Sequence, residues 1–183
     1  MTSLPHHEPR VTVEVVQGLF DCFAPLSEAL AARSRALGFD PQLLEPTYPV
    51  KAFSELVVAG ATERASGLPL DEALEQLGQQ TVRAMQARHR WLAALLPMMW
   101  LVGPHRMLAK ANARRIGQTD TEVLYTELGP TEGELVMRPC PLPRFHAGVI
   151  SQVVANAGVQ QVRVAVQRSS EVEAVFNVRW APR

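Results

Sequence analysis

The sequence predicts a single α+β domain, with an N-terminal helical bundle of four to five helices followed by a β-β-α-β-β antiparallel four-stranded sheet. The chain has 183 residues, of which 47% are hydrophobic and 20% charged, a balance typical of one globular domain with a sizeable core. Apolar residues recur at helical spacing up to residue 118 and alternate with polar residues beyond it. We therefore expect a helical half at 10–118 and a sheet half at 119–183, after a disordered tail at 1–9.

The domain is expected to begin with a short strand. Valines alternate with polar residues from Arg10 to Val16, which is the period of a half-buried strand. Ser27 can cap a following helix that runs to about Leu37, where Gly38 provides a C-terminal stop. The first half thus opens with one strand and one helix.

Two longer helices follow in the first half. Pro49 suits the first turn of a helix that ends near Ala65, after an irregular connection. The most regular pattern begins at Asp71 and keeps one apolar face as far as Arg88, with acidic residues in its first turn. These two patterns predict the main helices of the bundle.

The next part of the chain is strongly apolar. Residues 91–102 either continue the preceding helix or form an element of their own, and Pro97 interrupts them. Pro104 then opens a helix that runs to about Ile116. The bundle therefore has four or five helices, depending on how the apolar segment is arranged.

Beyond residue 119 the hydrophobic period changes from helical spacing to two. The predicted elements are strands at 121–128 and 133–138, a helix at 144–157, and strands at 162–167 and 172–180. Short turns rich in Gly, Pro and Ser join each pair of strands into a hairpin. A four-stranded, largely antiparallel sheet with one helix across it follows from this order.

The start of the chain and its cysteine content indicate a cytoplasmic protein. Residues 1–10 are polar and contain prolines, without the apolar run of a secretory signal. The longest apolar stretch, Trp91 to Gly103, is shorter than the roughly 20 residues that a membrane-spanning helix needs. Cys22 and Cys140 are too few for a disulfide framework or a cysteine-rich zinc site, which fits a reducing compartment.

The charge is balanced overall but unevenly distributed. The chain has 18 basic and 18 acidic residues, so the whole molecule has no electrostatic bias toward nucleic acid. Residues 76–118 carry seven bases and no acid, whereas residues 116–137 carry five acids and no base. This pattern fits either an anion-binding helical surface or two blocks that neutralise each other across the domain or face solvent.

The sequence contains no recognisable catalytic, metal-binding or nucleotide-binding motif. Its glycines lack the spacing of a phosphate-binding loop, and its serines lack a Gly-x-Ser-x-Gly context. His105 follows a Gly-Pro break and is expected at a helix start rather than in a metal site. An enzyme is therefore the less favoured alternative, with His89 or His146 as general base and an arginine that binds an anion. We predict neither a cofactor nor a metal ion.

Several short sequences, spread over most of the chain, carry a family resemblance. They are Leu37–Asp40, Tyr48–Val50, Leu68–Gly78, Leu101–Leu108, Thr126–Gly129 and Phe176–Trp180. Together they resemble a family of uncharacterised proteins of about this length, found mainly in myxobacteria. The resemblance implies a bacterial protein and brings no established activity with it.

The order of helices, hairpin, helix and hairpin also resembles a wider group of ligand-binding domains. This group includes haem nitric-oxide sensors, 4-vinyl-reductase-type sensors and vesicle-tethering transport-particle subunits. The resemblance implies a hydrophobic cavity between the helices and the sheet, often in a dimeric assembly. The haem branch matches poorly, because Tyr48 and Tyr125 do not begin the Tyr-x-Ser-x-Arg motif that binds haem propionates.

The expected function is non-enzymatic binding of a small hydrophobic or amphipathic anionic ligand, in a signalling role. Tryptophan and methionine often line adaptable apolar pockets, and both are concentrated after residue 90. The predicted cavity residues are Trp91, Leu95, Met98, Met99 and Trp100, and the predicted anion-binding rim is Arg88, Arg90 and Arg106. Such a segment more often forms the plain buried helix of a bundle, and a pocket would be lined by the same residues. The alternative function is an oligomeric scaffold or adaptor, and a homodimer is expected for either function.

Overall fold

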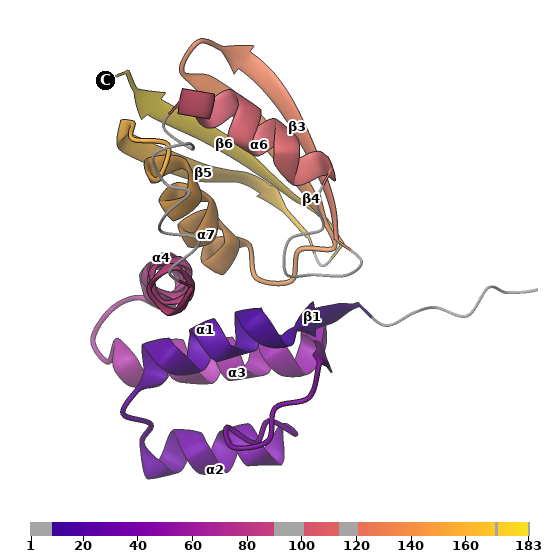
Figure 1. Ribbon diagram of the computed structural model, residues 1–183, viewed down its shortest axis with the longest axis vertical. Helices are drawn as coiled ribbons and strands as arrows, with labels where there is room; N and C mark the ends of the chain where they lie inside the picture. The colour runs from indigo at the N-terminus through magenta and orange to yellow at the C-terminus, as the bar shows by residue number, and fades with distance from the viewer. Residues whose placement is uncertain (1–8, 90–100, 114–120, 171, 183) are drawn as a thin grey trace, which may run out of the picture.

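The computed structural model describes residues 9–89, 101–113, 121–170 and 172–182. Figure 1 shows a helical half below and, above it, a sheet covered by helices. The predicted tail and most of the apolar 91–102 segment lie outside the described residues. Within the described residues, no helix is long and apolar enough to cross a lipid bilayer.

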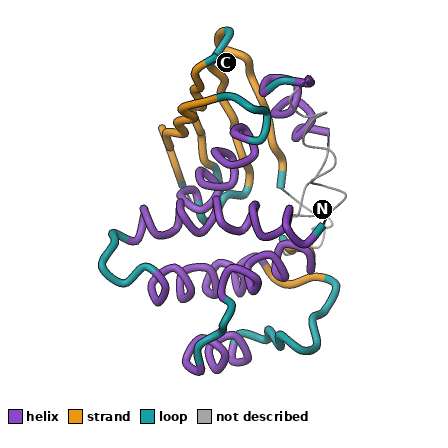
Figure 2. Tube along the Cα trace, turned by 60° about the vertical axis from the view of Figure 1, so that its left-hand side comes forward, coloured by secondary structure: helices purple, strands orange, loops and turns teal. Residues whose placement is uncertain are grey.

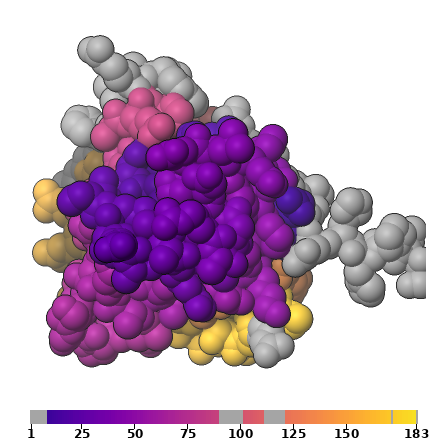
Figure 3. Space-filling view, turned by 90° about the horizontal axis from the view of Figure 1, so that it is seen from below, coloured from indigo at the N-terminus to yellow at the C-terminus, as the bar shows by residue number. Residues whose placement is uncertain are grey.

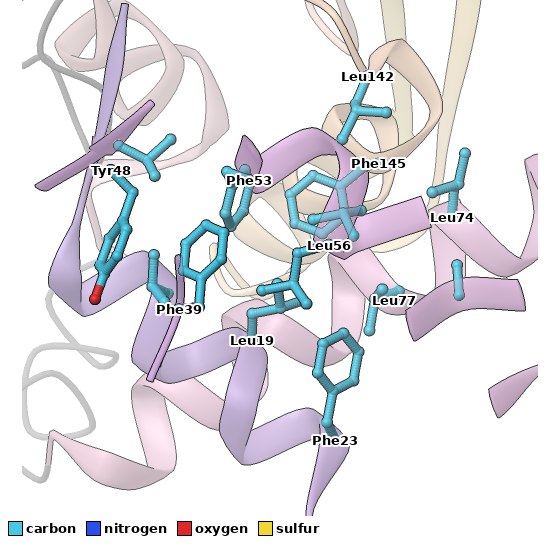
Figure 4. Close-up of a cluster of buried hydrophobic side chains, with 14 of the residues drawn as sticks. Leu19, Phe23, Phe39, Tyr48, Phe53, Leu56, Leu74, Leu77, Leu142 and Phe145 are labelled. Carbon is cyan, nitrogen blue, oxygen red and sulfur yellow. The ribbon is translucent and has the colours of Figure 1, made fainter. Parts of the chain in front are cut away.

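The helical half contains α1 (Val13–Phe23), α2 (Glu28–Ala36), α3 (Val50–Arg64) and α4 (Leu70–Arg88). These helices enclose a core of aromatic and aliphatic side chains, in which Phe39 stacks on Tyr48 with ring centroids 4.4 Å apart. Figure 4 shows the side chains of this core converging from α1, α3 and α4. Burial of this apolar surface is the main force that holds the helices together.

Local sequence signals explain where these helices begin and end. The Ser27 hydroxyl accepts a hydrogen bond from the Leu30 amide at 3.0 Å, so it caps α2 as predicted. Gly38 follows α2 with a φ of +86°, a conformation that glycine adopts without strain. The predicted helices that follow Pro49 and contain Asp71 are confirmed as α3 and α4.

The prediction of a strand through Val16 is wrong after its first three residues. Strand β1 (Arg10–Thr12) pairs antiparallel with β2 (Thr47–Pro49), and α1 begins directly afterwards. Val16, Leu19 and Phe23 are buried at helical spacing, so the same valines that alternate at the start also form a helical stripe. The longer apolar stripe determines the structure, because it buries more surface than a four-residue strand extension would.

The sheet half contains β3 (Glu122–Gly129), β4 (Glu132–Arg138), α7 (Pro143–Ala155), β5 (Gln160–Ser169) and β6 (Ala174–Ala181). All neighbouring strands are antiparallel, in the order β3-β4-β6-β5. This confirms the predicted β-β-α-β-β arrangement. Helix α6 (Pro104–Ala113) precedes the sheet in the chain.

One face of the sheet carries the second core. Leu135, Phe176 and Val178 on this face are almost fully buried, together with Leu108 of α6 and Ile150 of α7. Helices α6 and α7 lie on this same side of the sheet (Figure 2). The opposite side, which we call the outer face, has no described helix packed on it.

Helix α7 connects the two cores. Phe145, near its start, belongs to the core of the helical half and lies edge-on to Phe53, with ring centroids 6.1 Å apart. Ile150 and Val154, further along, belong to the core against the sheet. A single helix therefore contributes to both cores, and any relative movement of the halves must displace it.

The α4 and α7 backbones approach closely where two glycines meet. A Cβ atom on Gly78 would lie 2.1 Å from the Phe145 carbonyl oxygen, and one on Gly148 would lie 1.9 Å from the Glu75 carbonyl oxygen. Only glycine permits so close an approach between two helix backbones. We call this contact the glycine crossing.

Candidate functional site

The predicted cavity residues Trp91, Leu95, Met98, Met99 and Trp100, and the rim residue Arg90, lie outside the described residues. The elements on either side of them are described. Helix α4 packs in the helical half, whereas α6 inserts Leu108 into the core against the sheet. The apolar segment is therefore the covalent link between an element of one half and an element of the other.

The rim residue Arg88 is engaged in an ion pair. Its Nη1 atom donates to both carboxylate oxygens of Asp21 in α1, each at 2.8 Å. The pKa of Glu14 is lowered, chiefly by a hydrogen bond from the Thr12 side chain and to a smaller extent by the charge of His89. The basic end of α4 thus faces acidic groups of α1, which lie outside the acidic block at residues 116–137.

Arg106, the remaining predicted rim residue, is exposed on the first turn of α6. It follows His105, whose side chain points into the contact between α6 and the β3–β4 hairpin. Of the predicted rim residues that are described, Arg88 pairs with Asp21 of α1, and Arg106 lies on α6.

His105 lies in the first turn of α6, as the sequence predicts, and contacts three elements of the sheet. Its Nδ1 atom is hydrogen-bonded to the Tyr125 hydroxyl of β3, and its Nε2 atom lies 3.0 Å from the Pro130 carbonyl oxygen. The imidazole ring also packs edge-on against Trp180 of β6, with ring centroids 4.8 Å apart. We call His105, Tyr125, Pro130 and Trp180 the His105 cluster.

The partners of His105 determine its tautomer. Nε2 faces the Pro130 carbonyl and, at 3.7 Å, the Glu127 carboxylate, so it must carry a hydrogen. In the neutral ring Nδ1 is then the acceptor and receives the Tyr125 hydroxyl proton. Burial, and secondarily the charge of Glu127, raise the pKa of Tyr125 to about 12, so the phenol keeps the proton that it donates.

Gly133 provides the space for the Tyr125 ring. A Cβ atom at Gly133 would lie 2.5 Å from ring and hydroxyl atoms of Tyr125. Gly133 of β4 is paired with Glu127 of β3, and Tyr125 lies two residues before Glu127 on the same side of β3. The missing side chain lets the tyrosine ring lie across β4 and reach His105.

A second polar pair lies at the start of α7. The Cys140 sulfur is 3.6 Å from His146 Nδ1, which also lies 2.9 Å from the Leu142 carbonyl oxygen. Burial raises the pKa of the Cys140 thiol to about 12 and lowers the pKa of His146. Both groups are therefore neutral near pH 7, which does not match the thiolate–imidazolium pair of a cysteine nucleophile.

A shallow groove of about 520 Å³ lies on the helical half, far along the chain from these polar groups. It is formed between α2 and α3. Its lining combines four apolar side chains with four polar ones, which are Ala29, Leu30, Val58 and Ala59, and Arg33, Ser54, Glu55 and Glu63. Figure 3 views the molecule from this end, where N-terminal residues in indigo and purple form the surface. Within the described residues, no group of three His, Cys, Asp or Glu side chains is placed to hold a metal ion.

A family model described as "Protein of unknown function (DUF2378)" matches residues 10–181. The chain belongs to this family. No protein with curated information matches it. The sequence resemblance to an uncharacterised family is thereby confirmed at the level of the family.

Solved structures of H-NOX domains share the fold of this DUF2378 chain. Fe(II) unliganded H-NOX from K. algicida superposes with a TM-score of 0.58 at 8% identity, covering 94% of this chain and 97% of that one. An oxygen-binding H-NOX domain related to soluble guanylate cyclases gives 0.59 at 10% identity, covering 92% and 93%. A single-residue mutant of T. tengcongensis H-NOX gives 0.57 at 10% identity, covering 92% and 96%. At these identities the likeness shows the α+β fold.

The H-NOX likeness raises the question of haem, and His105, in the first turn of α6, does not fit the role of an iron ligand. An imidazole that binds iron must offer a nitrogen lone pair. Nε2 of His105 carries a hydrogen that faces two acceptors, and its Nδ1 lone pair accepts from Tyr125. Tyr48 is followed by Pro-Val and Tyr125 by Thr-Glu, so neither tyrosine begins a propionate-binding motif.

Sequence reasoning placed His105 correctly at a helix start but missed its partners. Tyr125 is separated from it by 20 residues, and Trp180 by 75. The sequence did contain an indication for Tyr125. Its side chain lies on the inward side of its strand, and the partner strand of the hairpin has a glycine, Gly133, on the same side. The pairing with α6 depends on packing and could not be inferred from periodicity.

Proposed function

We propose that this chain is a non-enzymatic module that binds a small ligand between its two halves and signals its presence. Among the described helices, α7 alone contributes side chains to both cores, and this supports the proposal, because a ligand held between the halves would alter their relative position through that helix. The H-NOX-like fold agrees with a ligand-binding role. The oxygen-binding H-NOX domain shows that this architecture can hold a small ligand in another protein.

The proposed ligand is hydrophobic or amphipathic, with an anionic group. Trp91, Leu95, Met98, Met99 and Trp100 are proposed to line the site, because their segment follows α4 of one half in the chain and precedes α6 of the other. Arg90 and the exposed Arg106 are proposed to bind the anionic group. Arg88 can join this rim only if it leaves Asp21, to which it donates two hydrogen bonds.

The ligand is proposed not to be haem, because the lone pair of His105 already accepts a hydrogen bond from Tyr125 and the chain lacks the propionate-binding motif. The direct check is to express the protein with a haem precursor and then titrate the purified protein with haemin. We expect no Soret band beyond that of free haemin. A stoichiometric, His105-dependent band would refute this part of the proposal.

Native mass spectrometry of the protein purified from its own host tests the proposal as a whole. We expect excess mass that disappears on denaturation. The Trp91→Ala/Met99→Ala variant should lose this mass, whereas Leu101→Ala should retain it, because Leu101 is 87% exposed. Circular dichroism melting checks that each variant is folded. Retention of the ligand by the folded double variant would exclude the proposed lining.

An adaptor role is the second candidate. The outer face of the sheet favours it specifically, since this face has no described helix packed on it.

A further inference from the structure

The outer face of the sheet is defined by the strand register. Leu124, Val136 and Val175 lie side by side on it, on β3, β4 and β6. None of the three belongs to either core. Leu124 is 42% exposed, whereas Val175 lies between flanking side chains and is 5% exposed. An apolar row therefore crosses three of the four strands of this face, from the edge strand β3 to β6.

Charged residues on the outer face divide between its two halves. The charged side chains of the β3–β4 half are Glu122, Glu132, Glu134 and Arg138, a net charge of −2 from three acids and one base. Those of the β6–β5 half are Arg163, Arg168, Arg179 and Glu173, a net charge of +2 from three bases and one acid. The face is thus acidic over β3 and β4 and basic over β6 and β5.

Most of these charges are already paired within the chain. Glu132 accepts from Arg179 at 2.9 Å, and Glu173 binds Arg138 at 2.6 Å and Arg168 at 3.0 Å. Such pairs between exposed side chains contribute little net stability.

Two charges of opposite sign have no such partner. Glu134 on β4 and Arg163 on β5 form no ion pair with any residue of the described chain. Arg163 is also directly opposite Arg179 across the strands, and like charges at opposed positions repel. Each half of the face therefore carries one uncompensated charge, acidic on β4 and basic on β5.

We propose that the outer face binds the same face of a second copy of this chain, about a two-fold axis parallel to the strands. This rotation leaves the position of each residue along the strand direction unchanged and reverses the order of the strands across the sheet. As a result, β4 of one copy lies over β6 of the other. Val136 then meets Val175 of the second copy. The acidic half of each face covers the basic half of the other, and Glu134 comes within reach of Arg163 across the interface.

Self-complementarity is what a two-fold interface requires, because the same patch must serve both partners. Face-to-face packing of two antiparallel sheets, about 10 Å apart, is a common way to cover such a surface. The uneven charge selects the two-fold arrangement in which opposite signs meet. A second copy thus satisfies both the apolar row and the unpaired charges.

The strand edges are less suited to association than the face. Register shifts interrupt β3 between Glu127 and Gly129, and β5 at two places. Gln161, near the start of β5, has a φ of 49°, which breaks the regular edge pattern. Bulged edges hinder pairing with another strand. Association through the edges would therefore lack a continuous ladder.

The size of the face predicts a weak dimer. Four strands about 4.8 Å apart and about seven residues long at 3.3 Å each present roughly 440 Å² per copy. The interface would bury roughly 900 Å² in total, at the low end for specific complexes. We therefore expect association that depends on protein concentration in the micromolar range.

Sedimentation equilibrium over about 1 to 300 µM, where interfaces of this size dissociate, tests the proposal. The average mass should rise from the 20.2 kDa of one chain toward twice that value. Leu124→Arg, on the apolar row, should keep the protein monomeric. Leu43→Arg is the matched control, because Leu43 is 77% exposed in the helical half, and it should still dimerise.

A charge exchange tests the arrangement of the two copies. Glu134→Arg and Arg163→Glu should each weaken the dimer at least tenfold, and the double variant should restore it within about threefold. These two residues form no ion pair within one described chain, so a rescue cannot come from the folded monomer. Melting temperatures within a few degrees of the unmodified protein confirm that the variants are folded.

A constant monomer mass at all concentrations would overturn the proposal. So would a dimer that survives Leu124→Arg, because it must use another surface. A double variant that remains as weak as the single variants would overturn the two-fold arrangement.

Discussion

The glycine crossing between α4 and α7 should be intolerant of a single added methyl group. In Gly148→Ala the new Cβ would lie 1.9 Å from the Glu75 carbonyl oxygen, whereas ordinary contact begins at 3.4 Å. The helices must therefore separate by about 1.5 Å, the difference between these two distances. The clashing atoms belong to backbone on both sides, so no side chain can rotate out of the way.

Separation of the helices would loosen contacts on both sides of the crossing. The Arg144–Asp71 ion pair at 3.0 Å and the Arg83–Gln152 hydrogen bond at 2.7 Å flank it. Overpacking usually costs about 1–3 kcal/mol, and we expect about 3 kcal/mol here because the backbone must move. For a domain of this size, this loss lowers the melting temperature by roughly 6–12 °C.

Urea unfolding followed by circular dichroism measures this loss, with Gly129→Ala as the matched control. A Cβ on Gly129 would meet no atom within 4 Å, so that variant should change the free energy of unfolding by no more than about 0.5 kcal/mol. Gly78→Ala should also destabilise, since its Cβ would lie 2.1 Å from the Phe145 carbonyl oxygen. The double variant should lose less than the sum, because one separation relieves both clashes. Equal stability of Gly148→Ala and Gly129→Ala would refute the close approach of the two helices.

Three further predictions concern the polar groups near the sheet. Tyr125→Phe removes the hydrogen-bond donor to His105, so urea unfolding should show a loss of about 0.5–1.5 kcal/mol in the free energy of unfolding. In the unmodified protein, nitrogen chemical shifts should show the hydrogen of the neutral His105 ring on Nε2, and a hydrogen on Nδ1 would contradict the assigned tautomer. Because burial raises the pKa of Cys140 to about 12, iodoacetamide at about pH 8 should label it only after unfolding, and rapid labelling of the folded chain would count against its burial. Burial lowers the pKa of His146, so the folded state favours the neutral imidazole. The stability that this contributes is present above the unfolded pKa of about 6.5 and is lost as pH falls below it. The His146→Gln variant should therefore lose less stability between about pH 7 and pH 5 than the unmodified protein does.

Local signals in the sequence were sufficient for most elements. Ser27 marks the start of α2 and Gly38 its end, as expected. The positions of the strands in both hairpins follow from the alternation of apolar and polar residues and from the turn residues between them. These signals act between residues that are close in sequence, so they are visible without the fold. These local signals fail where two patterns overlap. At Val13–Val16, the same valines belong both to an alternating pattern and to a helical apolar stripe.

The short sheet of β1 and β2 shows a second limit of what the sequence can predict. Arg10 pairs with Pro49, so β1 exists only because a segment nearly forty residues later returns beside it. The sequence indicated that β1 could form a strand, but not where it would end. Pairing with the three residues of β2 determines that end.

The sequence by itself determined the fold class, the helices with clear caps or breaks, and the strand order along the chain, because these depend on spacing and on neighbouring residues. Only the tertiary structure decided that His105 meets Tyr125 and Trp180, that Gly78 and Gly148 bring two backbones together, and that acids and bases divide across the outer face. Each of these contacts depends on strand register and helix packing between residues far apart in the chain. Periodicity shows which side of an element is buried, whereas the partner across the interface is selected by the packing of the whole domain.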